Sequence, residues 1–410
     1  MKTNSTSAMI RIFATAVVLL GGGAAAEAAA HTVYRVTDLG DPGGGTYSQG
    51  TTDNQSGWIA GFSALPGNTL LQAELWRRGV AQPLGGLGGP NSAVAWPNRN
   101  HHGVIVGIAE KRETQPLGEE WSCALAVFYL DTSDDHVCVG FVWSHNRMTA
   151  LPTLGGANGF ATGVNDRGQI VGWAEDTEHD PTCDEFNDTH QVLQFEAVVW
   201  TGHHGRYRVR ELPPYPGDLD GAATAINQEG EIVGISGICD GAIGGGTAQH
   251  MVEWRHGRVL RILPTLGGSY WNTPMDINNR GDVAGFSDHP GDGPLSPNFT
   301  AFFWSQRPFA CRDEIVPGGS SCDLGALPGD DSSEALGIND RDQVVGVSYP
   351  SGHAFIWQDG RMTDLNRLLA PGSTLLLSDA QDINDQGVIT GEAIVPSTGA
   401  TVAFEAVPVH

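Results

Sequence analysis

Two aspartates occupy equivalent positions in two copies of a sequence motif that recurs along the chain. We call this motif the phrase. Asp276 and Asp382 each lie two residues before an Asn that ends one segment of the phrase, where other copies have small or apolar residues. A pair of carboxylates in a pocket can act as general acid and base, or can bind a sugar. These two belong to the fifth and seventh copies, which are not neighbours. We therefore favour a hydrogen-bonding or surface role for each of them, and they are the catalytic candidates only if the chain is an enzyme.

Seven acidic side chains crowd one polar stretch between residues 175 and 190, and four of them are the candidate ligands of a metal ion. Asp176, Glu178, Asp180 and Asp184 offer the hard oxygen ligands that Ca²⁺ prefers. The stretch lacks the Asp-x-Asp-x-Asp-Gly spacing of a calcium-binding loop, so a solvated acidic loop is the interpretation that we favour. We expect no other cofactor.

Three aromatic residues open the first segment of the third and fifth copies of the phrase. These are Phe160, Tyr270 and Trp271. We expect them to be exposed near the channel mouth, where their ring faces would suit stacking on a glycan ring. They are the candidate ligand-binding residues.

The elements that must position these residues are repeats. The clearest copy of the phrase reads Asn-Asp-Arg-Gly-Gln-Ile-Val-Gly at residues 165–172. Its Gly-x-(Ile/Val)-(Val/Ala/Thr)-Gly part begins at Gly57, Gly103, Gly168, Gly230, Gly281 and Gly387, and at Asp342 in one further copy. A second series of seven aromatic residues follows at matching intervals: Trp76, Trp143, Trp200, Trp254, Trp304, Trp357 and Phe404. Both series count seven units.

Each unit reads as four short strands joined by turns. Val, Ile, Trp and Phe fill the strands, and Gly, Asp and Asn fill the turns, which is typical of β-structure. The mean period is (387 − 57)/6, or 55 residues, and four-stranded units of this length predict the blades of a β-propeller. The first strand of the units is expected to end at Asn54, Asn98, Asn165, Asn227, Asn278, Asn339 and Asn384, which puts Trp96 two places earlier in the second unit.

The two ends of the chain predict how the ring closes. The last unit stops after its third strand, near Glu405, and lacks a fourth. The stretch Tyr-Arg-Val-Thr-Asp-Leu-Gly at residues 34–40 matches fourth-strand text but precedes the first unit. A ring can pair this stretch into the last blade, whereas an open solenoid has no use for it. We predict an all-β, seven-bladed propeller clasped by residues 33–39.

The repeat text resembles the extracellular HAF repeat family of bacteria. The residues that carry the resemblance are His-Ala-Phe-Ile-Trp at 353–357, Gly-Arg-Met-Thr-Asp-Leu at 360–365 and Thr-Leu-Gly-Gly at 153–156. The resemblance covers nearly all of the chain after residue 30. It implies a secreted bacterial β-propeller and transfers no catalytic residues. Only one copy keeps the eponymous His, His353, so the His is not part of a ring of ligands.

The first 30 residues predict export. Lys2 and Arg11 precede a short apolar run and a small-residue tract that ends at Ala30, the pattern of a secretory signal peptide. Residues 31–410 are then one propeller domain, secreted or periplasmic, and we expect a monomer. The formal net charge of −25 should repel nucleic acid and anionic membranes, so neither is an expected partner.

Long connections should gather on one side of the ring. We call the side with the first-to-second turns the turn face, and the side with the second-to-third connections the loop face. Long second-to-third connections occur in blades 2 to 4, at 110–139, 175–196 and 237–250, with a shorter one in blade 5 at 288–298. They should build an asymmetric wall, because rigid scaffolds usually carry binding residues on such loops.

Four of the six cysteines fall within these connections. In an exported chain they predict disulfides rather than metal ligands. Cys123 and Cys138 share the blade 2 connection, and Cys183 and Cys239 occupy the corresponding connections of blades 3 and 4. Cys311 and Cys322 are assigned to the third-to-fourth connection of blade 6. We predict these three bridges.

Two classes of function are compatible with this pattern. One is a non-catalytic module that binds a glycan or an extracellular envelope protein through the long loops. The other is an exported polysaccharide lyase or glycosidase with its site at the channel mouth. The chain lacks a Gly-x-Ser-x-Gly elbow and the Ser-x-Asp-x-Gly-x-Thr-Trp boxes of sialidases. A deep mouth that brings Asp276 and Asp382 together would favour the enzyme, and a plugged channel would favour binding.

Overall fold

The computed structural model describes residues 32–97, 100–119, 127–128, 136–183, 191–203, 205–239, 248–291, 293, 298–309, 311 and 321–409. These residues belong to one compact unit, Thr32–His410. The expected signal peptide lies outside the described residues. Within them, no helix is long and apolar enough to cross a membrane.

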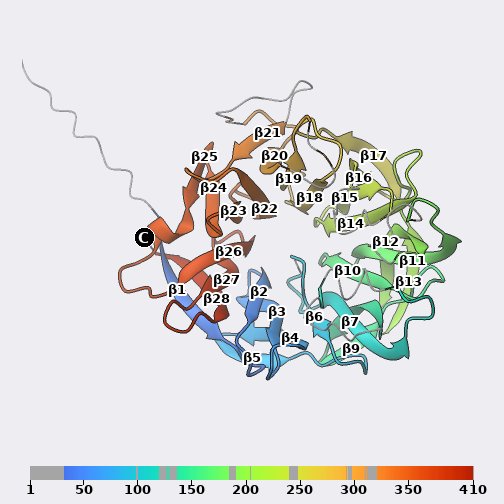
Figure 1. The fold of residues 1–410 in the computed structure, drawn as a ribbon, viewed down its shortest axis with the longest axis horizontal. Coiled ribbons are helices and arrows are strands. Elements are labelled where there is room, and N and C mark those ends of the chain that lie inside the picture. Colours follow the sequence, from blue (N-terminus) through green and yellow to red (C-terminus); the bar gives the residue numbers. More distant parts are fainter. Residues whose placement is uncertain are drawn as a thin grey trace, which may run out of the picture. The chain divides into compact units, whose positions relative to one another are not determined.

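Seven four-stranded antiparallel sheets make up this unit, and they follow one another in chain order around a common centre (Figure 1). Each sheet is one blade. Its first strand lies nearest the centre and its fourth lies at the rim. The predicted seven-bladed β-propeller is confirmed.

The strands of blades 1 to 3 are β2 (Ser48–Asp53), β3 (Trp58–Ala64), β4 (Leu71–Arg77) and β5 (Val80–Pro83); β6 (Ser92–Ala93), β7 (Ile105–Thr114), β8 (His136–Ser144) and β9 (Arg147–Ala150); and β10 (Gly159–Val164), β11 (Ile170–His179), β12 (Leu193–His203) and β13 (Arg206–Glu211). Those of blades 4 and 5 are β14 (Asp220–Ile226), β15 (Glu231–Gly237), β16 (His250–Arg255) and β17 (Arg258–Leu263); and β18 (Asn272–Ile277), β19 (Val283–Asp288), β20 (Phe299–Trp304) and β21 (Ser321–Gly325).

Blade 6 consists of β22 (Ser332–Ile338), β23 (Val344–Tyr349), β24 (His353–Gln358) and β25 (Arg361–Asp364), followed by a short 3₁₀ helix, η3 (Leu365–Leu368). Blade 7 consists of β26 (Leu376–Ile383), β27 (Ile389–Ile394), β28 (Thr401–Val409) and the N-terminal strand β1 (Val33–Gly40). β1 pairs antiparallel with β28, from Val33 opposite Val409 to Gly40 opposite Ala403. The predicted clasp is therefore confirmed, and the two ends of the ring share one sheet.

The seven aromatic residues of the third strands form the core between blades. All of them are buried: Trp76, Trp143, Trp200, Trp254, Trp304, Trp357 and Phe404. Three of the indoles also donate their N–H to a backbone carbonyl of the blade before, to Leu39, Pro152 and Pro213. The series therefore has the structural role expected of a residue that recurs in every unit.

The recurrent Asn residues join the blades into a closed ring. Each side-chain amide donates to the backbone carbonyl of the corresponding Asn in the next blade, in the order Asn54, Asn100, Asn165, Asn227, Asn278, Asn339, Asn384 and back to Asn54, at N···O distances from 2.8 to 3.5 Å. Each Oδ1 also accepts the backbone N–H groups two and four residues ahead, as Asn165 does from Arg167 and Gln169. One side chain thus caps its own turn and binds its neighbour. The turns have the predicted left-handed residue, with φ of +71° at Gly168 and +59° at Asp342.

Blade 2 departs from the predicted register. Asn100, not Asn98, is its ring residue. Ala93 pairs with Ile108 and lies seven residues before Asn100. In blade 3 the equivalent residue is Phe160, which pairs with Trp173 and lies only five residues before Asn165. The segment between the first strand of blade 2 and its ring Asn is therefore two residues longer than in blade 3. The prediction that Trp96 lies two residues before the ring Asn is wrong.

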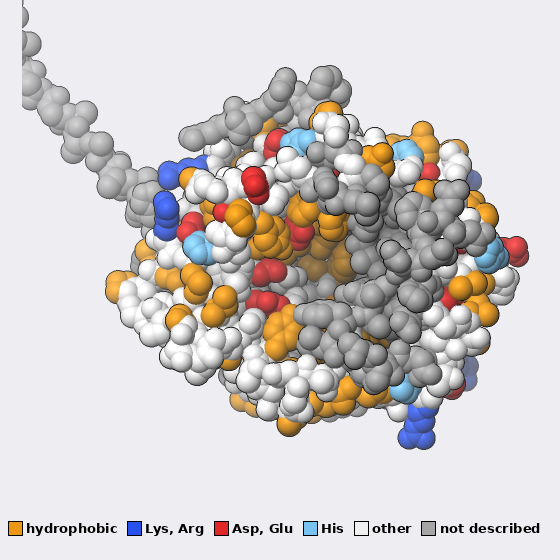
Figure 2. Space-filling view, viewed as in Figure 1, with side chains coloured by type: hydrophobic (Ala, Val, Ile, Leu, Met, Phe, Trp, Pro, Cys, Tyr) orange, Lys and Arg blue, Asp and Glu red, His pale blue; other side chains and the backbone are white. Residues whose placement is uncertain are grey.

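Those extra residues place Trp96 across the centre of the ring. The Trp96 ring packs edge-on against Phe160 of blade 3, with ring centroids 6.2 Å apart. It also packs against an apolar cluster from blades 5 and 6 that contains Met275 and Leu336. Figure 2 shows hydrophobic side chains inside the central hollow. Trp96 therefore contacts side chains of blades 3, 5 and 6 at the middle of the ring.

Candidate functional site

The two catalytic candidates hold neighbouring blades together. Asp276 accepts the backbone N–H of Ile338 in blade 6, at 3.0 Å. Asp382 accepts the backbone N–H of Asp53 and the hydroxyl of Thr52 in blade 1, each at 3.1 Å. Both are buried, at different blade boundaries. The structure does not bring them into one site, and their contacts are those of the hydrogen-bonding role.

The aromatic candidates are not a stacking platform. Phe160 is only 4% exposed and lies edge-on to both Trp96 and Trp173, so its expected exposure is wrong. Trp271 is half-buried and packs edge-on against Phe286 and Phe299. Tyr270 is half-buried too. Because aromatic neighbours surround the ring of Trp271, its stacking on a sugar would be limited to the exposed part.

Among the described residues of the acidic stretch, the carboxylates of Asp176, Glu178 and Asp180 do not form a cluster. Asp176 and Glu178 lie on β11, and Glu178 is exposed. Asp180 is buried, and its Oδ1 accepts the backbone N–H and the hydroxyl of Thr182. Asp184 lies outside the described residues. Three of the four expected Ca²⁺ ligands therefore have separate environments.

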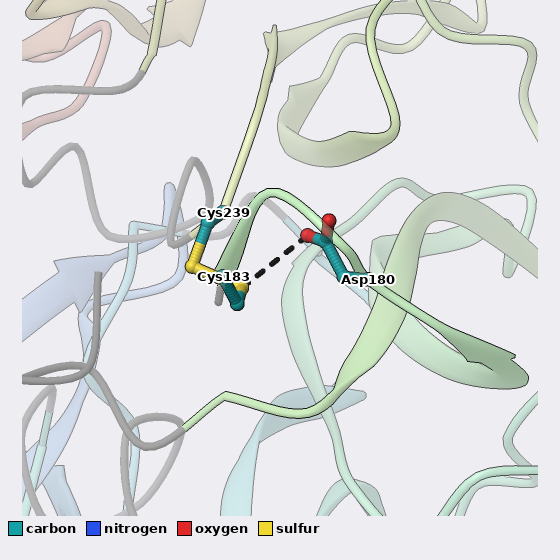
Figure 3. Close-up of side chains that lie close together, drawn as sticks. All are labelled: Asp180, Cys183 and Cys239. Carbon is teal, nitrogen blue, oxygen red and sulfur yellow. Dashed lines mark hydrogen bonds between the residues drawn. A yellow bond between two sulfur atoms is a disulfide. The ribbon is translucent and has the colours of Figure 1, made fainter. Parts of the chain in front are cut away.

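Asp180 lies instead beside a disulfide (Figure 3). It is grouped with Cys183 and Cys239, the sole cluster of potential metal ligands found in the described part of the chain. Because these two sulfurs are bonded to each other, they are not available to a metal. Cys183 Sγ then carries no proton, so its 3.3 Å approach to Asp180 Oδ2 is a contact rather than a hydrogen bond.

The disulfides follow the expected pairing. Cys183 is bonded to Cys239, and Cys311 to Cys322. The second bridge lies between β20 and β21, so its assignment to blade 6 is wrong and it belongs to blade 5. Cys138 is also disulfide-bonded, and its expected partner, Cys123, lies outside the described residues. Disulfides indicate an oxidising compartment.

The long connections of blades 2, 3 and 4 are tied to one another. Glu119, from blade 2, accepts the backbone N–H groups of Val192 and Leu193 in blade 3, at 3.0 and 2.8 Å. The Cys183–Cys239 bridge joins blade 3 to blade 4. We call the described residues of these three connections the loop wall: 115–119, 127–128, 180–183, 191–192, 238–239 and 248–249. The corresponding connections of blades 6, 7 and 1 are short, so the loop face has one elaborated side and one low side.

On the low side, a structurally equivalent position carries acids instead of apolar residues. The residue after the second Gly of each phrase is Phe62, Ile108, Trp173, Ile235, Phe286, Val347 or, in blade 7, Glu392. The first-strand residues paired with these seven are Gln49, Ala93, Phe160, Ala222, Thr273, Glu334 and Asp379. Blades 6 and 7 thus bring together Glu334, Asp379 and Glu392, which we call the mouth carboxyls.

The mouth carboxyls differ from two other buried acids of the same fold, Glu110 and Glu175. Glu110 and Glu175 accept backbone N–H groups from their own blades, at 2.8 to 3.0 Å, which explains why those positions are acidic. Glu334 accepts no hydrogen bond within the described residues. Oδ1 of Asp379 is also buried without a partner. Within the described residues, none of the mouth carboxyls accepts a backbone N–H group.

Two tyrosines complete this cluster. The Tyr47 hydroxyl donates to Oε1 of Glu392 at 2.8 Å. Burial raises the pKa of Tyr349, and the charges of Glu334, Asp379 and Glu392 raise it further, so its hydroxyl lies within electrostatic reach of all three. In Figure 2, acidic side chains gather on the side of the central hollow where β22, β26 and β2 lie.

Burial decides the protonation of the cluster. Burial first, and then the charge of Asp379, together raise the pKa of Glu334 to about 8 and that of Glu392 to about 8. Burial also raises the pKa of Asp379 to about 7. A set of carboxyls poised near neutral pH is a common feature of functional sites. Sequence reasoning missed this set, although the lone acid at Glu392 among apolar equivalents was visible.

These shifts predict a dependence of stability on pH. The folded protein holds protons that the unfolded chain releases, so the contribution of each mouth carboxyl is present below about pH 4.5 and is lost as pH rises through 7 to 8. The triple variant E334Q/D379N/E392Q should lose less stability than the wild type between pH 6 and pH 9, by roughly 1 kcal/mol per carboxyl. Urea unfolding at the two pH values measures this. The exposed E113Q is the control, and an unchanged pH dependence in the triple variant would contradict the assignment.

Comparison with known proteins finds solved structures of low sequence identity. No family model and no curated protein matches the chain. Similar solved structures include the β-propeller domain of Myceliophteria thermophila Cps50 (Swd1), at 11% identity and a TM-score of 0.46, over 89% of this chain and 98% of that one. A polysaccharide lyase PL25 ulvan lyase matches at 10% identity and 0.40, over 91% and 94%. Trypanosoma rangeli sialidase in complex with the inhibitor DANA matches at 10% identity and 0.36, over 74% and 53%. At such identities the likeness concerns the fold alone.

Proposed function

We propose that this chain is a secreted HAF-repeat propeller that binds a glycan, or an extracellular envelope protein, on its loop face without converting it. The observation that carries the proposal is Trp96, which packs from blade 2 onto blades 3, 5 and 6 and fills the centre of the ring. A large side chain at the centre of the ring favours a mouth that is too shallow to enclose a substrate. The catalytic candidates Asp276 and Asp382 are engaged in bonds between blades.

The division of the loop face supports the same proposal. The loop wall is a connected body over blades 2 to 4, and the low side over blades 6, 7 and 1 has short connections. A ligand can rest on the low side and against the wall. Tyr349, 36% exposed, is the largest aromatic residue offered to solvent at this place. Tyrosine at such a position is typical of recognition surfaces.

One observation favours a second candidate, an exported lyase or glycosidase. The mouth carboxyls have pKa values of about 7 to 8, the range in which a carboxyl acts well as general acid at neutral pH. The reacting groups would then be Glu334, Asp379 and Glu392, not Asp276 and Asp382. Binding stays the first proposal because Trp96 occupies the centre of the ring, where a deep pocket would have to enclose a reacting bond.

A binding and degradation screen tests the proposal. Mature protein is applied to a panel of extracellular polysaccharides and to isolated envelopes, with and without Ca²⁺, and retention and product release are both measured. We expect retention without products, weakened about tenfold by Tyr349→Ala on the loop face and unchanged by Arg167→Ala on the turn face. Release of cleavage products that disappears in Asp379→Asn would establish the enzyme instead. Retention by no polymer and no envelope would overturn the binding proposal.

A further inference from the structure

We infer that the outer rim of the ring carries a second binding site, for an anionic polysaccharide, on the hairpin formed by β12 and β13 of blade 3. The inference goes beyond the proposed function, which concerns the loop face. Three observations carry it. The hairpin is longer than its equivalents, its arginines share one face, and these arginines have no ionic partner within the described residues.

The outer hairpin of blade 3 has two more residue pairs than those of other blades. In blades 1, 2, 4 and 6, one pair separates the third-strand Trp from the turn, as Arg77 paired with Val80 does in blade 1. In blade 3, three pairs follow Trp200, and the last is His203 opposite Arg206. β13 lies at the rim (Figure 1), and residues 201–203, 206 and 208 are exposed. The added length is therefore offered to solvent.

The arginines of this hairpin lie on one face. We call them the rim arginines: Arg206, Arg208 and Arg210. They alternate with Tyr207 and Val209, which pack in the core between blades 2 and 3, and successive side chains of a strand point to opposite faces. Arg210 is paired with Val199, which packs against blade 4. The rim arginines therefore face blade 4, and each lies about 7 Å from the next along the strand.

The rim arginines have no counter-ion on the protein. Within the described residues, none of them forms an ion pair or a side-chain hydrogen bond. In blade 4, by contrast, Arg255 binds Glu231 at 3.3 Å. The one acid of β13, Glu211, is paired with Val198 and so faces blade 2. No other five-residue stretch of the chain has three Lys or Arg residues. On a chain with a formal net charge of −25, this is a local cationic row.

An aliphatic strip on blade 4 lies opposite the rim arginines. Val259 and Ile262 of β17 are 37% and 39% exposed. Their register partners on β16 pack in the core between blades 3 and 4, so both side chains face blade 3. The guanidinium of Arg210 lies against Gly257, in the turn before β17, so the two rims adjoin there. The surface combines a row of cations with an aliphatic strip.

This combination favours a sugar polymer with repeated anionic groups. A guanidinium binds a carboxylate or another oxyanion through two parallel N–H···O bonds. Convergent arginines would suit one small anion, whereas arginines spaced along a strand suit anions spaced along a chain. The aliphatic strip can contact the C–H face of the sugar rings. Single-stranded nucleic acid is bound largely by stacking on aromatic rings, and Tyr207, the one Tyr of β13, faces blade 2 instead.

Binding to immobilised polymers tests the inference. The mature protein is applied to polygalacturonate, dextran sulfate, uncharged dextran, polyglutamate and single-stranded DNA, and the Kd of each is measured. We expect an anionic polysaccharide to bind tightest, and its binding to weaken when NaCl is raised from about 0.05 M to about 0.5 M. The variant R206Q/R208Q, which leaves the contact of Arg210 with blade 4 intact, should weaken it about tenfold or more.

Two matched variants separate charge at this site from charge elsewhere. R206K/R208K keeps both charges and should retain more of the binding than R206Q/R208Q does. R361Q removes an exposed arginine at the rim of blade 6, where β25 has no second one, and should bind as the wild type does. Thermal melting of each variant checks that it is folded.

Several outcomes would overturn the inference. Absence of binding to every anionic polysaccharide would do so, as would binding that R206Q/R208Q leaves unchanged. If such binding is lost in Tyr349→Ala instead, the proposed function stands and the rim site does not. Tighter binding of polyglutamate would replace the polysaccharide by an acidic protein, and tighter binding of DNA would replace it by a nucleic acid. Cleavage products would refute the proposed function, whereas the loss in R206Q/R208Q would still establish the rim site.

Discussion

Replacing Tyr34 by alanine is expected to lower the free energy of unfolding by about 3–5 kcal/mol, the cost of deleting a large buried ring. Tyr34 is 1% exposed and lies in a core cluster with Leu377 and Phe404 of blade 7 and Leu365 of η3. It is the one fully buried side chain of β1 in the described structure. Its loss would weaken the strand that closes the ring. Guanidinium unfolding monitored by tryptophan fluorescence measures the change.

Two matched variants separate the ring from the strand. Tyr34→Phe keeps the aromatic ring and should change stability by less than about 1 kcal/mol, since the described residues give the hydroxyl no hydrogen bond. Thr37→Ala alters an exposed position of the same strand, paired with Glu405, and should stay within about 0.5 kcal/mol of the wild type. If Tyr34→Ala were as mild as Thr37→Ala, β1 would not hold the ring closed.

Replacing Asn165 by aspartate is expected to cost about 3 kcal/mol or more. The new carboxylate could still accept the N–H groups of Arg167 and Gln169, but it would lose the donor to the carbonyl of Asn227 and face that oxygen with a buried negative charge. Asn165 is fully buried. Urea unfolding at neutral pH measures the loss.

The control for the Asn ring is a neighbour in the same turn. Arg167 is exposed, and its side chain makes no hydrogen bond in the described structure; Arg167→Ala should therefore be nearly neutral. Part of the loss in Asn165→Asp should return at acid pH, where the carboxyl is protonated and can donate. Equal stability of Asn165→Asp and wild type at neutral pH would show that the amide does not join blades 3 and 4.

The sequence predicted this architecture well because its signals are local and repeated. The Asn-x-x-Gly turns, the third-strand Trp series and the orphan strand at 34–40 each recur or match within the text. Seven copies average out the variation of any single one. The error at Asn98 arose where a unit has two extra residues, since a spacing rule does not detect an insertion that the fold accommodates toward the centre of the ring.

The candidate site was predicted poorly because it depends on contacts between units. Asp276 and Asp382 stood out as unlike residues at like positions, yet each is used to bind the adjacent blade. Phe160 appeared available for a ligand, yet Trp96 covers it. The mouth carboxyls lie 45 residues apart at Glu334 and Asp379, and β-sheet register sets which of their neighbours share their face. No spacing rule in the sequence contains that register.

The sequence by itself therefore determined the number of blades, the strand order, the closure and the core of this protein. Those features follow from hydrophobic alternation and turn chemistry, which act over a few residues and repeat in every unit. Only the tertiary structure decided which acids are partnered, which aromatic fills the channel and where three unpaired carboxyls meet. Burial and the charge of a neighbour shift a pKa, and both depend on segments that are distant in the chain.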